Sequence, residues 1–205
     1  MREKDDGARE KILEGARAEF LEKGFAEASM RAIAERAGFT TGMLYSRFAD
    51  KAEIFRELVE EPAEQLYAYF SQVQEDFARL PAGEQRQRMH TYVDEKVEHM
   101  VNFIYDHFDA FKLIVCKSGG TSYQYYVDRM IDVETQSTFR FIEVLRALGA
   151  EVREIRRDFA HMLSSAMFNG MFEVVSHDLS REDAFDYIRQ LQRFFNAGWD
   201  CLLGL

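Results

Sequence analysis

Hydrophobic residues recur at helical spacing along almost the whole chain. Ile12, Ala16 and Phe20 form one apolar stripe, and Ile54 and Leu58 begin another. Spacings of three and four residues are typical of amphipathic α-helices. No internal repeat and no low-complexity tract interrupts the pattern. The pattern therefore predicts an all-α protein of about nine helices.

Residues that favour helix ends separate the first four predicted helices. They are Gly24 and Gly38 as C-terminal glycines, and Ser29, Thr40 and the Asp50–Glu53 capping box as N-terminal caps. We expect Gly24 to adopt the left-handed conformation after the first helix, so that Phe25 can contact Phe20. The second and third helices, near residues 29–37 and 40–48, are then short and close together in the chain.

Longer helices are predicted in the rest of the chain. The fourth begins at Asp50 and continues past Pro62 with a kink. The remaining predicted elements are a loop at 80–84, a helix to about 107, a short helix at 108–117, a long helix that stops at Gly149, and helices at about 151–177 and 181–203.

Composition supports a globular helical protein. The 205 residues are 47% hydrophobic and 14% aromatic, but they include only 2 Pro and 12 Gly, which is unusual for a β-rich fold. No apolar run is long enough to cross a bilayer, and the charged first residues do not resemble a signal peptide. The 2 cysteines, Cys116 and Cys201, are far apart, and Cys116 is expected in the core. A reduced, cytoplasmic location fits this cysteine usage.

The charge is strongly acidic overall but not in the region of the short helices. The formal net charge of −10 argues at first against a nucleic-acid partner. Residues 29–56, however, hold five basic and three acidic side chains, so their balance is 5 − 3 = +2. An acidic body could therefore present a small basic face to DNA.

The segment AGFTTGMLYSRF fits the second half of a helix-turn-helix. If Leu44 and Phe48 point inward, the outer face of the third helix carries small and hydroxyl-bearing residues. Such residues, with backbone N–H groups at a helix N-terminus, can bind phosphates and approach DNA closely. The alternative is an ordinary corner between two helices of a bundle, which periodicity alone does not separate from a DNA-binding motif.

The order of residues favours the DNA-binding interpretation. The stretch EFLEKGFAEASMRAIAERAGFTTGMLYSRFADKAEIF resembles the N-terminal domain of the TetR family, the tetracycline-repressor-like transcription regulators, from about Lys11 to Leu58. The resemblance implies a three-helix DNA-binding domain at residues 1–52 and a helical ligand-binding and dimerisation domain at residues 53–205. It also implies DNA contacts by Ser29, Arg31, Thr40, Thr41, Gly42, Tyr45 and Ser46, and a phosphate contact by Lys51.

The last two helices have features of a dimer interface. The final helix is apolar on one face at Ile188 and Phe195, and on another at Phe194 and Cys201. A helix with two apolar faces in a small domain often packs against a second subunit, although a helix buried within one chain would show the same pattern. Small residues in the preceding helix, including Gly170, would allow close packing. We therefore expect a homodimer and a near-palindromic operator.

Polar groups on otherwise apolar C-terminal helices predict an effector site. The predicted ligand-binding residues are Tyr67, Phe70, His99, Asn102, Phe103, Tyr123, Tyr126, Met130, Ser165 and Asn169. An apolar pocket with a few polar groups is typical of small-molecule sites, and these walls favour an apolar or aromatic effector. The alternative is that these groups bond one another or water. The fourth helix, through Tyr67 and Phe70, would couple the effector to DNA.

No motif for catalysis stands out. The pairs Glu95–His99 and Glu173–His177 each lack a third metal ligand at fixed spacing, and no phosphate-binding loop or nucleophile elbow is present in the sequence. We expect no metal, no cofactor and no enzyme activity. The sequence predicts a transcription regulator, a repressor released by a small molecule. The alternative is a helical small-molecule-binding or carrier protein without DNA binding.

Overall fold

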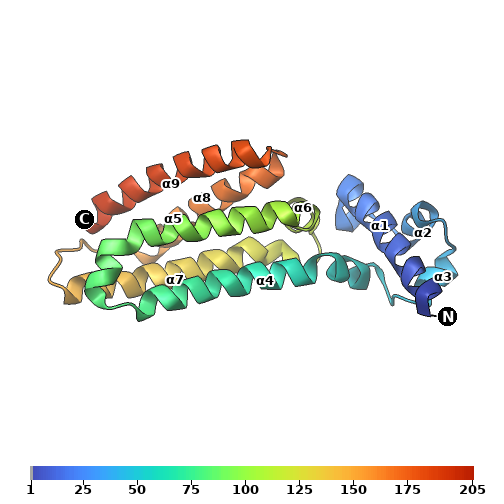
Figure 1. Ribbon diagram of the computed structural model, residues 1–205, viewed down its shortest axis with the longest axis horizontal. Helices are drawn as coiled ribbons and strands as arrows, with labels where there is room; N and C mark the ends of the chain where they lie inside the picture. The colour runs from blue at the N-terminus through green and yellow to red at the C-terminus, as the bar shows by residue number, and fades with distance from the viewer. Residues whose placement is uncertain (1) are drawn as a thin grey trace. The chain divides into compact units, whose positions relative to one another are not determined.

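The computed structural model describes residues 2–205, with side chains from Gly7 onward (Figure 1). Within these residues the chain is helical and contains no β-strand, which confirms the predicted all-α fold. The elements are α1 (Arg2–Glu27), α2 (Met30–Ala37), α3 (Thr41–Tyr45), α4 (Lys51–Arg79), α5 (Ala82–Asp106), α6 (Phe108–Lys117), the 3-10 helix η1 (Ser122–Tyr125), α7 (Tyr126–Ala147), α8 (Arg157–Ser176) and α9 (Arg181–Leu203). None of the described helices is both long and apolar enough to span a membrane.

Contacts divide the chain into two compact units. The first contains the chain up to Glu64 together with His107–Tyr126, and the second contains Gln65–Asp106 and Val127–Leu205. The predicted domain boundary after residue 52 is a functional division and stays a prediction. The continuous helix α4 contributes its first half to one unit and its second half to the other.

An aromatic cluster forms the core of the first unit. The ring of Phe20 lies edge-on to that of Phe55, with centroids 5.1 Å apart, and Phe25 lies 5.4 Å from Phe55. Helix α6 packs against α1. The buried Tyr126 hydroxyl donates a hydrogen bond to the Ala63 carbonyl at 2.9 Å. These contacts explain why a short segment from the middle of the chain belongs to the first unit.

The second unit is a bundle of the second half of α4 with α5, α7, α8 and α9 (Figure 1). Helix α9 packs against both α5 and α8. A side-chain hydrogen bond from Gln74 to Glu134 and an ion pair between Arg140 and Glu75 connect α4 to α7. At one end of the bundle, Leu145 of α7 and Leu203 of α9 are buried in the same apolar cluster.

Four local expectations were wrong. Gly24 has φ 79 and ψ 165, which is not the left-handed helical conformation but one that essentially only glycine adopts. The expected contact of Phe25 with Phe20 is confirmed, and the two rings are stacked with centroids 6.0 Å apart. Helix α5 starts at Ala82, so the expected 80–84 loop is shorter, because the buried Gln85 side chain donates to the carbonyls of Ala78 and Leu80 at the end of α4.

The third wrong expectation concerns the start of α8, which begins at Arg157 rather than near residue 151. Val152 and Ile155 in the preceding non-helical segment pack against the Leu145–Leu203 cluster. The fourth concerns Cys116, which is exposed rather than in the core. Helix α6 buries Phe111 and Ile114 on its other face.

Candidate nucleic-acid interface

The two short helices are shaped by the residues that the sequence marks as caps. The Ser29 hydroxyl accepts a hydrogen bond from the Ala32 N–H at 3.2 Å and starts α2. Gly38 ends α2 in the left-handed conformation, with φ 74 and ψ 28. The Thr40 hydroxyl then accepts from the Met43 N–H at 3.3 Å and starts α3. All three capping predictions are confirmed.

A glycine lets α1 and α2 approach closely. A Cβ atom at Gly15 would lie 2.9 Å from the backbone nitrogen of Ala37, at the last turn of α2. Any side chain at Gly15 must therefore push α2 away from α1. Close approach of two helices leaves no mark in the spacing of apolar residues, so the sequence does not reveal this role of Gly15.

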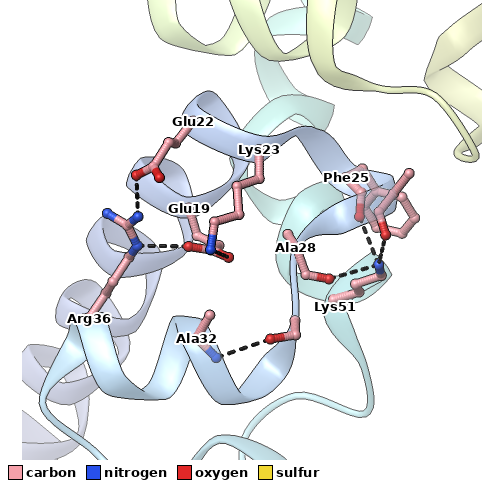
Figure 2. Close-up of polar contacts among 10 residues, drawn as sticks. Glu19, Glu22, Lys23, Phe25, Ala28, Ala32, Arg36 and Lys51 are labelled. Carbon is pink, nitrogen blue, oxygen red and sulfur yellow. Dashed lines mark hydrogen bonds and ion pairs between the residues drawn. The ribbon is translucent and has the colours of Figure 1, made fainter.

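A buried carboxylate holds α2 on α1 (Figure 2). Glu19 is 1% exposed, and its Oε2 accepts from Arg36 Nε at 2.7 Å while Lys23 Nζ lies 3.2 Å from its Oε1. The Arg36 guanidinium also pairs with Glu22, and this hydrogen bond lowers the pKa of the Glu22 carboxyl. A buried charge is tolerated when paired, so these residues define how α2 lies on α1. The role of Glu19 could not be predicted from the sequence either.

Lys51 has a different environment from the expected one. Its Nζ donates to the carbonyl oxygens of Phe25, Ala26 and Ala28 at 2.7, 3.0 and 2.9 Å, and lies 4.6 Å from the centre of the Phe25 ring (Figure 2). The last carbonyls of a helix lack partners within it, and the ammonium supplies them at the end of α1. All three ammonium protons are used in this way. These hydrogen bonds give Lys51 a structural role, and its predicted phosphate contact stays a prediction.

Most basic side chains of residues 29–56 already have partners within the protein. Arg36 is bound by two glutamates, Lys51 by three carbonyls, and Arg47 Nη1 donates to the Met43 carbonyl at 3.4 Å. Arg56 lies 3.9 Å from Glu60. Arg31 is exposed on α2 and has no ion-pair partner among the side chains from residue 7 onward. It is the cation best placed to meet an external anion.

The remaining predicted DNA-binding residues lie together on α3 and its N-terminus. Leu44 and Phe48 are buried as predicted, which turns the opposite face of the helix outward. That face comprises Thr40, Thr41, Gly42, Tyr45 and Ser46, all exposed. Tyr45 is 59% exposed although it is a large aromatic residue. This small surface of hydroxyls, a phenol and a glycine can approach a DNA groove without steric hindrance.

The second unit contains a cavity of about 160 Å³ with contributions from all five of its helices. Its aromatic walls include Phe70, Phe77, Tyr92, Phe141 and Trp199. An engineered cavity of about 150 Å³ can hold benzene, so this volume suits one aromatic ring. Of the predicted ligand-binding residues, Phe70 lines this cavity.

The other predicted ligand-binding residues lie elsewhere. Met130 lines a separate cavity of about 20 Å³, which has room for about one water molecule. Tyr123 and Tyr126 belong to the first unit. Asn102, Phe103, Tyr67 and Ser165 are half-buried outside the lining of the larger cavity, and Asn169 and His99 are exposed. Asn169 donates a hydrogen bond to the Ser165 carbonyl, and the rings of His99 and Tyr69 are tilted with their centroids 4.4 Å apart. The role of these residues in ligand binding stays a prediction.

An apolar face is exposed on the last two helices. Phe194 is 73% exposed on α9, and Met162 is 66% exposed on α8. Ile188 and Phe195 on the other face of α9 are buried within the chain. A Cβ at Gly170 would lie 3.1 Å from Leu191 Cδ2, so this glycine serves packing of α8 on α9 within one subunit rather than between subunits.

Comparison with known proteins also indicates a TetR-family DNA-binding domain. Residues 12–58 match the family described as "Bacterial regulatory proteins, tetR family". A TetR-family regulator from Streptomyces coelicolor A3 shares the fold with a TM-score of 0.60 at 17% identity, over 90% of this chain and 88% of that chain. NalD of Pseudomonas aeruginosa, the secondary repressor of the MexAB-OprM multidrug efflux pump, shares it with a TM-score of 0.55 at 20% identity, over 93% and 96%. Residues 12–58 thus match the TetR-family sequence, and most of the chain shares the fold of TetR-family regulators.

The curated relatives are named as HTH-type transcription regulators. The transcriptional repressor AcnR of Corynebacterium glutamicum is 38% identical over 61 residues, which cover 30% of this chain and 32% of AcnR. The chain thus matches about a third of the length of that relative. The transcriptional regulator UidR of Escherichia coli is 24% identical over 182 residues, or 86% of each chain. The TetR-family likeness is therefore strongest in the N-terminal unit.

Proposed function

We propose that this chain is a sequence-specific DNA-binding transcription regulator that reads the major groove with α3. The observation that carries the proposal is the outer face of α3, where exposed Thr41, Gly42 and Tyr45 stand on a helix anchored by buried Leu44 and Phe48. Exposed Arg31 on the adjacent α2 supplies a phosphate contact. The family match over residues 12–58 supports the same role.

We further propose that the chain acts as a homodimer through the exposed face of α8 and α9 and is a repressor. Phe194 and Met162 are large apolar residues at the surface of this face, and association removes such residues from water. Two-fold symmetry requires half-sites about 34–36 Å apart. The names of AcnR and NalD, both repressors, support the direction of regulation.

The proposed release mechanism is a shift in population. An effector in the 160 Å³ cavity would favour a dimer whose α3 helices no longer match the half-sites. Helix α4 is the covalent connection, because it begins in the DNA-binding unit at Lys51 and contributes Phe70 to the cavity. The expected effector is a small molecule of about one aromatic ring.

The test begins with selection of DNA from a randomised library by the purified protein, followed by fluorescence anisotropy on the selected duplex. Tyr45→Ala should weaken binding by about 1–3 kcal/mol, because it removes a contact to the groove. The matched control is Tyr125→Ala, since Tyr125 is 58% exposed against 59% for Tyr45 but lies in η1. The proposal fails if both variants bind as the wild type does. Failure to select any sequence would favour the alternative, a small-molecule carrier without DNA binding.

A further inference from the structure

One acidic group in the cavity wall has no basic partner. Glu134 of α7 lines the cavity, and its Oε2 accepts a hydrogen bond from Gln74 Nε2 at 2.7 Å. Among the described side chains no Lys, Arg or His forms an ion pair with this carboxyl. Burial raises the pKa of Glu134 to about 7, which shows how poorly its negative charge is compensated. A carboxyl that faces a cavity in this state attracts a cation from outside.

The rest of the wall suits an apolar cation. Phe70, Phe77, Tyr92, Phe141 and Trp199 present aromatic rings to the cavity, and methionines from α5 and α8 complete much of its surface. Aromatic faces attract cations, and this attraction grows when the ion is removed from water. The same rings and thioethers also favour the organic part of a ligand. A small hydrated metal ion would gain little from such walls.

The other charged groups at the cavity already have partners or neighbours. His90 of α5 lies 2.9 Å from an Asp200 carboxylate oxygen, and Lys96 of α5 places its Nζ 5.4 Å from the centre of the Tyr92 ring. Helix α8 contributes only apolar residues to this wall, and α9 contributes amides, a tryptophan and a leucine. Lys96 could in principle attract an anion, but an anion would then share the cavity with the Glu134 carboxyl.

We propose that the cavity selects an organic cation of about one aromatic ring, with the Glu134 carboxylate as its counter-ion. The assignment rests on the proposed function in one respect only, namely that a ligand in this cavity is the effector. It adds the charge and chemical class of that ligand. Cation binding stabilises the ionised carboxyl, so the affinity rises with pH through the range in which Glu134 loses its proton.

The experiment uses the intact protein and its single tryptophan, Trp199, as a fluorescent reporter in the cavity wall. The probes are phenyltrimethylammonium, its neutral isostere tert-butylbenzene, and benzoate. From pH 6 to pH 8 the affinity for the cation should rise about tenfold, because a carboxyl with a pKa of about 7 goes from about one tenth to about nine tenths ionised. The affinity for the neutral isostere should stay constant.

Two variants make the test specific. Glu134→Gln keeps an acceptor for Gln74, and it should weaken cation binding at pH 8 by at least about tenfold, remove the pH dependence and leave tert-butylbenzene binding unchanged. Glu143→Gln, an exposed position on the same helix, is the matched control and should behave as the wild type. The pH series on the wild-type protein tests the assignment even if a variant does not fold.

Three results would overturn the assignment: an unchanged cation affinity in Glu134→Gln, a pH dependence that persists in that variant and so belongs to His90, or tighter binding of benzoate than of the cation. DNA binding is measured on the same samples. Cation binding without any DNA binding would contradict the proposed function and support the cavity assignment. DNA binding by a protein whose cavity prefers benzoate would support the proposed function and contradict the cavity assignment.

Discussion

Replacement of Lys51 by methionine tests the largest difference between expectation and structure. The ammonium donates three hydrogen bonds to carbonyls at the end of α1 and lies on the Phe25 ring. Methionine keeps much of the apolar stem but leaves the carbonyls of Phe25, Ala26 and Ala28 without their donor. The variant therefore separates a structural role from a phosphate-binding role.

The expected loss of stability follows from these contacts. The net contribution of a hydrogen bond with a charged donor to protein stability is about 1.5–3 kcal/mol. Three bonds from one half-buried ammonium do not add fully, because water can reach the carbonyls after truncation. We expect Lys51→Met to lower the free energy of unfolding by about 2–4 kcal/mol, or the melting temperature by roughly 5–15 °C. Urea denaturation followed by circular dichroism measures this change.

The salt dependence of DNA binding provides the contrast. Loss of one phosphate contact lowers the slope of log K against log salt by about 0.9. We expect that change for Arg31→Gln, the exposed matched control, with little loss of stability. Lys51→Met should lose stability and retain the slope. The reasoning is refuted if Lys51→Met unfolds at the wild-type urea concentration and lowers the slope by about one unit.

Three further substitutions have defined outcomes. Gly15→Ala should lower the free energy of unfolding, measured by urea denaturation, by about 1–3 kcal/mol and weaken DNA binding, because its methyl group would lie 2.9 Å from the backbone of α2. The control Gly83→Ala has open space around it and should be neutral or stabilising. Phe194→Glu should raise the dimer dissociation constant at least about thirtyfold by sedimentation while Leu148→Glu does not, and a dimeric Phe194→Glu would contradict the proposed interface. The Glu134 pKa of about 7 lies above its unfolded value of 4.5, so its contribution to stability is complete below pH 4.5 and is lost as pH rises to about 7. The free energy of unfolding of Glu134→Gln should therefore rise by up to about 2–3 kcal/mol relative to that of the wild type between pH 5 and pH 8. Equal pH profiles of stability for the two proteins would exclude this.

Interactions over a few residues were readable from the sequence. The caps at Ser29 and Thr40 and the C-terminal Gly38 are confirmed, as is the inward position of Leu44. Each of these depends on a side chain and backbone atoms within about four residues, or on a 3.6-residue period. The exposed face of α3 follows from the same periodicity, and so does the second apolar face of α9.

Tertiary structure alone decided which distant groups meet. Lys51 lies 23–26 residues from the carbonyls it binds, Arg36 lies 17 from Glu19, and Gln74 lies 60 from Glu134. A charged residue in a sequence looks equally suited to solvent, to DNA or to a partner within the protein, because its energy depends on burial and on which charges surround it. Apart from Phe70, the residues that line the cavity could not be predicted for the same reason. Periodicity shows which face of a helix is apolar, but the packing of five helices determines which part of that face remains open to a ligand.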